Sequence, residues 1–209
     1  MKRILFFVFF MADFLFVSAQ TYNEWIDKSF ECIESEDWAG AEKALIGALR
    51  VQPANPQNAL LLSNLGTIQR KMGKNDEALK SYTNALMITP RSVTLLMNRA
   101  ALFSEMEKFD DALKDYNQVL MLDDKEEDAL YLRGLIRLKK NDTTACRKDF
   151  EQLLKINPKS SDARIGLAAL MKLRGYYTEA IDLYTQVIRV NPEQTSFYLN
   201  RGEAYLLNR

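Results

Sequence analysis

The sequence predicts an all-α fold, a solenoid made of repeated helix-turn-helix units. Three observations predict it. The same kinds of residue recur every 34 positions along most of the chain, and a fixed period of this size is typical of repeat architectures. With 8 Gly and 5 Pro among 209 residues, the chain has few of the turn residues that a β-sandwich needs. Its 47% hydrophobic and 27% charged residues are ordinary for a folded soluble protein.

Residues 1–19 have the layout of a secretory signal peptide. Two basic residues precede an apolar run that ends in small residues, so we predict cleavage between Ala19 and Gln20. The alternative is an uncleaved membrane anchor, but Asp13 interrupts the run, which is shorter than the roughly 20 residues that cross a bilayer. We therefore expect an exported protein, periplasmic or secreted, in a bacterial envelope, with no membrane span after cleavage.

A small residue and an aromatic residue recur together along the rest of the chain. The small residues are Ala78, Ala112, Cys146 and Ala180, and the aromatic residues four positions later are Tyr82, Tyr116, Phe150 and Tyr184. A proline follows at the same register in Pro90, Pro158 and Pro192. This order within a 34-residue unit resembles the tetratricopeptide repeat, a helix-turn-helix unit. The resemblance implies a right-handed superhelical solenoid with a concave face.

The register of the prolines sets the predicted units in order. They are residues 22–55, 59–92, 93–126, 127–160 and 161–194, followed by a partial unit, 195–209. The first helix of a unit is expected to stop at its fifteenth position, where Gly73, Asn141 and Gly175 tolerate a left-handed backbone. The proline then stops the second helix. Extra residues just after Pro53 predict a looser junction between the first two units.

The residue content excludes several kinds of chemistry. The chain has no His, so a Ser-His-Asp triad and a His-based metal site are ruled out. Its formal net charge of 0 lacks the basic excess of a nucleic-acid-binding protein. Cys32 and Cys146 fall at packing positions, and the acidic residues of 123–128 are expected to favour a helix start rather than bind calcium. We predict no catalytic residue, no metal, no cofactor and no nucleic-acid partner.

Basic residues recur at the seventh position of the units, as Lys28, Arg99, Arg133 and Arg201. We interpret them as structural residues whose aliphatic stems pack while the charged heads reach solvent. Arg133, Arg137, Lys139 and Lys140 cluster on one predicted helix. An anion-binding site there is the alternative interpretation.

The resemblance also implies where a ligand would bind, because ligands of this family lie along the concave groove. The residues at the groove positions of the first helices are Asn64, Met97, Asn98, Ala101, Tyr131, Leu135, Ile165, Ala169, Leu199 and Asn200. The paired Lys, Asn and Arg with which some members clamp a chaperone carboxylate are missing, since Asp128 and Leu132 stand at two of those positions. The three Asn resemble a ladder that holds a peptide backbone, and ordinary hydrogen bonding is the alternative. The apolar groove favours an amphipathic helix.

The predicted function is an exported, non-catalytic scaffold or adaptor that binds a peptide or helix of a protein partner in this groove. Two alternatives stay open. The chain is the first part of a longer enzyme or sensor whose active domain follows residue 209, or it is a structural homo-oligomer. In the latter, Phe197, Tyr198 or Tyr205 of the terminal helix packs against another copy.

Overall fold

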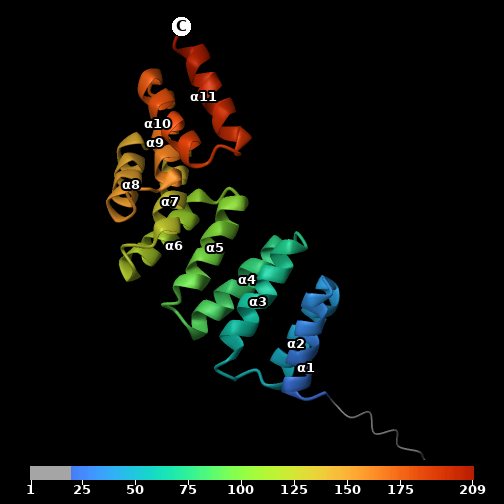
Figure 1. The fold of residues 1–209 in the computed structure, drawn as a ribbon. Helices are drawn as coiled ribbons and strands as arrows, with labels where there is room; N and C mark the ends of the chain where they lie inside the picture. Colours follow the sequence, from blue (N-terminus) through green and yellow to red (C-terminus); the bar gives the residue numbers. More distant parts are fainter. Residues whose placement is uncertain (1–19) are drawn as a thin grey trace, which may run out of the picture. The chain divides into compact units, whose positions relative to one another are not determined.

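The computed structural model describes residues 20–209, and all regular structure in this part of the chain is helical (Figure 1). The helices are α1 (Tyr22–Glu34), α2 (Trp38–Val51), α3 (Asn58–Lys71), α4 (Asn75–Ile88), α5 (Val93–Glu105), α6 (Phe109–Leu122), α7 (Glu127–Lys139), α8 (Thr143–Ile156), α9 (Ser161–Leu173), α10 (Tyr177–Val190) and α11 (Thr195–Leu207). The predicted all-α repeat solenoid is confirmed. The predicted signal peptide, residues 1–19, lies outside the described residues.

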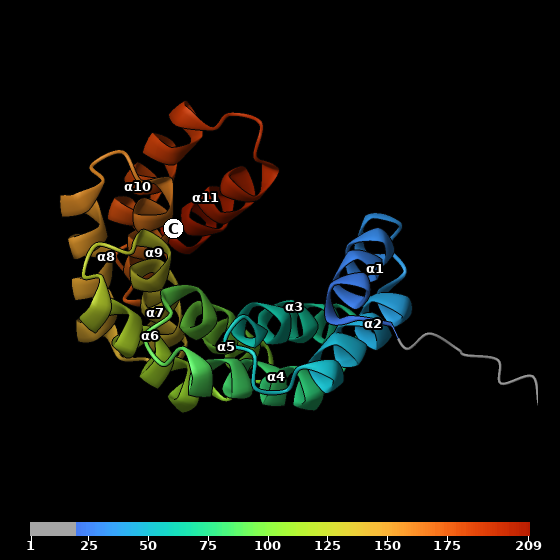
Figure 2. The same cartoon turned by 90° about the horizontal axis from the view of Figure 1, so that it is seen from below.

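The chain divides into two compact units between Pro53 and Ala54. Unit 1 contains the helix pair α1 and α2, whose interface buries the small and aliphatic residues of α2. Unit 2 contains α3 to α11, in which each helix packs against its neighbours in sequence. The first helices of successive pairs also contact each other, α3 with α5 and α7 with α9. Within unit 2 these first helices therefore line the inner side of a curve (Figure 2).

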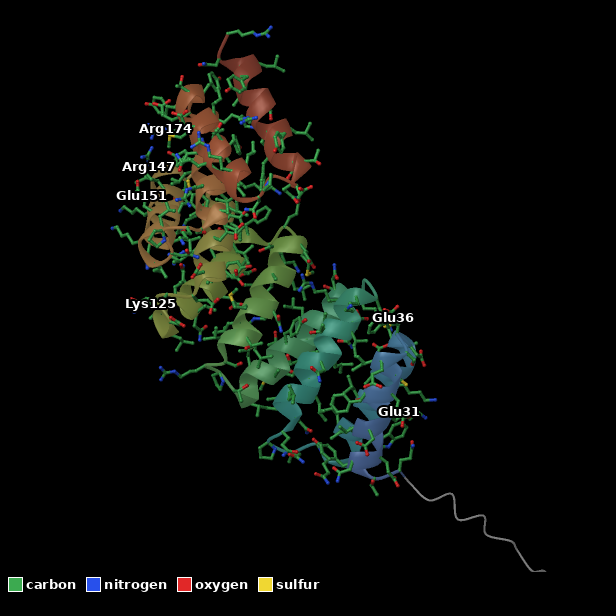
Figure 3. All side chains as sticks on the ribbon, viewed as in Figure 1. Glu31, Glu36, Lys125, Arg147, Glu151 and Arg174 are labelled. Atoms are coloured by element: carbon green, nitrogen blue, oxygen red, sulfur yellow. The ribbon has the colours of Figure 1, made fainter. Side chains whose placement is uncertain are left out.

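The turn inside each helix pair requires one residue with a left-handed backbone. Gly73, Asn141 and Gly175 occupy this position with φ of 74°, 60° and 80°, as their conformational tolerance predicts. Glu36 (labelled in Figure 3) and Glu107 adopt the same conformation with φ of 57° and 56°. In each turn the following residue donates its N–H to a carbonyl five positions back, as Lys108 does to Phe103 at 2.8 Å. The packing of the helix pair thus imposes the turn even where the residue disfavours it.

Aromatic side chains on the second helices join the pairs of unit 2. Tyr82, Tyr116, Phe150 and Tyr184 are all buried. Phe150 of α8 shows why small residues stand opposite them. A Cβ atom added at Gly134 of α7 or at Gly166 of α9 would lie 2.5 Å from this ring. The ring is therefore held between the first helices of its own and the next pair.

Three arginines tie the first helices to acids on the second helices. Arg99 makes two hydrogen bonds to Asp115, both of 2.8 Å, and Arg133 makes two to Asp149, of 3.2 and 2.6 Å. Arg137 also donates to Asp149 at 2.6 Å. The prediction that these residues have a repeated structural use agrees with the contacts. For Arg99 and Arg133 the prediction that the heads reach solvent is wrong, because bidentate pairing with buried carboxylates leaves these side chains only 20% and 14% exposed. Lys28 is exposed, as predicted.

Candidate peptide-binding surface

The ten predicted groove residues all lie on first helices of unit 2. Asn64 is on α3; Met97, Asn98 and Ala101 are on α5; Tyr131 and Leu135 are on α7; Ile165 and Ala169 are on α9; and Leu199 and Asn200 are on α11. Nine of the ten are half-buried, so each keeps part of its side chain on the surface. Leu199 is the most exposed of them. These helices line the inner side of unit 2 (Figure 2).

Leu135 and Ala169 come together in an apolar hollow of 640 Å³. The other lining residues are Leu138, Lys139, Lys172, Leu173 and Leu207. Leu173 and Leu207 keep 55% and 47% of their surface exposed. Exposed aliphatic side chains gathered around a concavity are typical of an interaction surface. We call this concavity the inner hollow.

The remaining predicted groove residues lie outside the inner hollow. Asn64, Met97, Asn98 and Ala101 belong to earlier first helices, and Leu60 on α3 lines a separate hollow of 260 Å³ with Ser63. Leu173 and Leu207 were missed by the sequence interpretation. Their position in the repeat could have indicated them. Leu173 and Leu207 are the thirteenth residues of their repeats, and Leu138, which also lines the hollow, is the twelfth residue of its repeat.

Lysines at the rim of the inner hollow pair with acids on neighbouring repeats. Lys139 donates to Glu107 at 3.3 Å, and Lys172 donates to Glu203 at 2.6 Å. Lys140 donates to Asp110 at 2.6 Å. Arg133 and Arg137 bind Asp149, so every member of the predicted basic cluster has an acidic partner. This pairing argues against an anion-binding site.

The opposite end of α7 and α9 is acidic. Burial raises the pKa of the Asp162 carboxyl, and the nearby Asp128 and Glu127 raise that pKa further. Glu127 accepts a hydrogen bond from Asn157 Nδ2 at 2.9 Å. Within residues 20–209, the side chains of Asp128 and Asp162 form neither an ion pair nor a hydrogen bond. A cationic group brought to this end would lower the free energy of the carboxylates.

Tyr131 connects the acidic end with the apolar surface. Its ring centroid is 6.3 Å from that of Phe150, so one face of the side chain rests on the core of unit 2. Burial raises the pKa of the Tyr131 hydroxyl, and the Asp162 carboxylate raises it further. Tyr131 therefore stays neutral near pH 7 and presents a hydroxyl beside the acidic end.

The three groove asparagines are not held by the rest of the described chain. Asn64, Asn98 and Asn200 are half-buried, and residues 20–209 provide no side-chain hydrogen bond to any of them. Their amides are therefore open to solvent or to a ligand's backbone. They lie on α3, α5 and α11, so α7 and α9 carry no asparagine at the corresponding position.

In the range 20–209, no group of three or more Cys, Asp and Glu side chains is arranged to hold a metal ion. Cys146 is buried, and its burial raises the pKa of the thiol. None of α1 to α11 has the length and apolar character needed to cross a bilayer.

The paired helices of unit 2, with their first helices on one side, define a helical repeat protein. Three family models described as tetratricopeptide repeat match residues 61–94, 128–160 and 169–209. A solved tetratricopeptide repeat protein from Parabacteroides merdae is 40% identical, with a TM-score of 0.85, and the match covers 89% of this chain and 73% of that one. The chain belongs to the tetratricopeptide repeat family.

Two further solved structures concern peptide binding. The first repeat domain of Spaghetti, bound to an HSP90 peptide, is 29% identical and has a TM-score of 0.53, over 57% of this chain and 94% of that one. YrrB, described as having an unusual peptide-binding site, is 18% identical with a TM-score of 0.63, over 81% and 87% of the two chains. No curated protein matches the sequence. Proteins of this fold commonly mediate binding to proteins or peptides.

Proposed function

We propose that the protein is an exported, non-catalytic scaffold that binds a helix or peptide of a protein partner on the inner side of unit 2. The observation that carries this proposal is the inner hollow. Leu135, Leu138, Leu173 and Leu207 form an apolar floor there, and the lysines on its rim are neutralised by acids of this chain. The peptide-bound state of Spaghetti supports the same kind of ligand.

The charges along α7 and α9 favour a particular ligand. Among residues 20–209, Asp128 and Asp162 have no cationic partner, whereas the lysines at the other end of α7 and α9 already have acidic ones. A ligand that places apolar side chains in the hollow and a Lys or Arg near Tyr131 would satisfy both features. The preferred ligand is therefore an amphipathic segment with a basic residue at one end.

Affinity capture from an envelope fraction tests the inner surface. The bait is residues 20–209, compared with a Tyr131→Ala, Leu135→Ala double variant. The matched control is a Met87→Ala, Met121→Ala double variant, because both methionines are exposed on second helices, α4 and α6. A partner lost by the first variant and kept by the control supports the proposal. Equal capture by all three baits contradicts it.

The export part of the proposal has its own test. Sequencing of the N-terminus of the native protein from the envelope fraction is expected to begin at Gln20. A native N-terminus at Met1, or recovery of the protein only from the cytoplasm, would contradict export while leaving the binding surface unaffected.

A further inference from the structure

Helices α7 and α9 together carry a strip that is acidic at one end and apolar at the other. The two helices contact each other, and each packs against its own second helix, α8 or α10. Spacings of three and four residues place one set of side chains on a single face of each helix. We call this set the inner strip: Asp128, Tyr131, Leu135 and Leu138 on α7, and Asp162, Ile165, Ala169 and Leu173 on α9.

The length of the inner strip fixes the register of a ligand. Asp128 and Leu138 are ten residues apart in α7. At 1.5 Å per residue, this spacing corresponds to about 15 Å along the helix axis. A lysine stem on the ligand bridges about one helical turn of that distance, which leaves about two turns, or seven residues, of a helical ligand.

The inner strip lacks partners for an extended backbone. Between the acids and the inner hollow its side chains are aliphatic, apart from the Tyr131 hydroxyl. Leu132 and Gly166 stand at the position where α3 and α5 carry Asn64 and Asn98. An extended peptide on this strip would lose water from its N–H and C=O groups without new hydrogen bonds, which is unfavourable. A helix satisfies these groups internally, so the strip favours a helical ligand.

The charges of the inner strip set the direction of that helix. Within residues 20–209, Asp128 and Asp162 have no cationic partner, whereas Lys139 and Lys172 at the apolar end already pair with acids. A ligand therefore gains most from a Lys or Arg at the acidic end. Because the helix dipole stabilises a cation in the last turn of a helix, the C-terminal end of the ligand lies there. The ligand then runs antiparallel to α7 and α9.

We propose that the inner strip binds an amphipathic helix of a partner protein, antiparallel to α7 and α9, with an aliphatic anchor in the inner hollow and a Lys or Arg seven residues after it. This inference rests on the proposed function and adds the conformation, direction and register of the ligand. Apolar residues three and four positions after the anchor would cover Leu135 and Ala169, and the cation would pass Tyr131 to reach the acids.

Three stapled helical peptides of one composition test the register and the direction. Each has Leu as anchor and Leu three and four positions later, with Gln elsewhere and one Lys. The Lys is seven residues after the anchor in the first peptide and nine residues after it, on the opposite face, in the second. The third peptide has the reversed sequence of the first. Fluorescence anisotropy measures their binding to purified residues 20–209.

We expect the first peptide to bind about fivefold more tightly than the other two, since only it pairs its Lys with the acids. An Asp128→Asn, Asp162→Asn variant should remove this preference, and so should 0.5 M NaCl, because salt screens exposed charges. The matched control is Asp76→Asn, Glu77→Gln, which changes the net charge equally at exposed sites on α4 and should keep the preference.

The Tyr131→Ala, Leu135→Ala variant separates this inference from the proposed function. Equal binding of the three peptides that this variant weakens would contradict the register and direction while leaving the proposed surface intact. Binding of none of them, or binding that this variant leaves unchanged, would contradict both. Equal binding of an unstapled peptide whose helix is broken by Pro would overturn the proposal in favour of an extended ligand. Self-association of the chain that this variant removes would overturn it in favour of a second copy.

Discussion

Leu135 of α7 and Leu207 of α11 line the same hollow, although a whole helix pair, α9 and α10, lies between their repeats in the chain. Leu207 reaches this place because α11 packs on α10 and is also tied to α9 by the ion pair of Lys172 with Glu203. The curvature of unit 2 therefore assembles the candidate binding surface. Residues on one helix alone do not form it.

The first prediction concerns Asp149, which is 2% exposed and binds two arginines. Asp149→Asn leaves Arg133 and Arg137 without a carboxylate in a mostly buried place, so we expect the free energy of unfolding to fall by about 3 kcal/mol. Asp115→Asn, which affects only Arg99, should cost less. Urea unfolding followed by circular dichroism measures both, with Asp111→Asn, at a partly exposed site, as the matched control.

Equal midpoints for Asp149→Asn and Asp111→Asn would contradict this account of the arginine pairs. A large loss for Asp149→Asn that Asp149→Leu does not show would also contradict it, because both variants leave Arg133 and Arg137 without a carboxylate.

The second prediction contrasts two glycines at the same position of their units. Gly134→Ala forces a Cβ atom against Phe150, which cannot move away because Gly166 lies equally close on its other side. We expect a loss of about 1 to 3 kcal/mol from this overpacking. Gly202→Ala meets open space in an exposed helix, so it should stabilise α11 by up to about 1 kcal/mol.

Thermal unfolding of the two alanine variants checks this contrast. If Gly134→Ala unfolds at the same temperature as the unmodified chain, the ring of Phe150 is less constrained than its neighbours indicate.

The structure also shows which parts of the fold could be predicted. The helix pairs follow from the periodic small and aromatic residues, because burial against a neighbouring helix requires both at fixed spacing. The register places a turn at Glu36 and Glu107, but their left-handed backbone could not be predicted from the residue type, since Glu does not favour φ of 57° or 56° and only the packing of the pairs imposes it.

Less of the candidate surface was predictable from single residues. The periodicity placed Leu135 and Ala169 on the inner helices, but it could not show that Leu207 would lie beside them. That contact depends on how far the helix axes rotate from α7 to α11, over two successive repeats. The heads of Arg99 and Arg133 were wrongly expected in solvent, because the acids that bind them lie sixteen residues further on and outside any local pattern.

The third prediction concerns stability at high pH. Burial raises the pKa of Tyr184 to about 12, with smaller contributions from Glu203 and Tyr131. The folded chain thus holds this proton more tightly than the unfolded chain, whose Tyr has a pKa near 10. The contribution of this raised pKa to the free energy of unfolding is complete below about pH 10 and is lost as pH rises toward 12. Tyr184→Phe should reduce the fall in unfolding midpoint between these pH values.

Tyr205→Phe, at an exposed site on α11, is the control and should leave the pH profile unchanged. A Tyr184→Phe profile that superimposes on that of the unmodified chain would contradict the link between burial and protonation.

The fourth prediction concerns the buried thiol. Cys146 is fully buried, its Sγ lies 3.3 Å from the Thr143 carbonyl, and its burial raises the pKa of the thiol. Alkylation requires an accessible thiolate, so Cys146 should resist iodoacetamide at pH 8 until the chain unfolds. Cys32 is partly exposed and should react earlier. Peptide mass spectrometry after timed quenching measures both sites, and equal rates would contradict the packing of α8.

Site-specific photo-crosslinking tests the central claim most directly. The photoreactive residue p-benzoylphenylalanine replaces Leu173 in the inner hollow or Met121 on the opposite, second-helix side, and both positions are exposed. In cells of the source organism, the account predicts a crosslink to one protein from position 173 and none to that protein from position 121. The same crosslinks from both positions, or a partner captured only from position 121, would contradict binding at the inner side of unit 2.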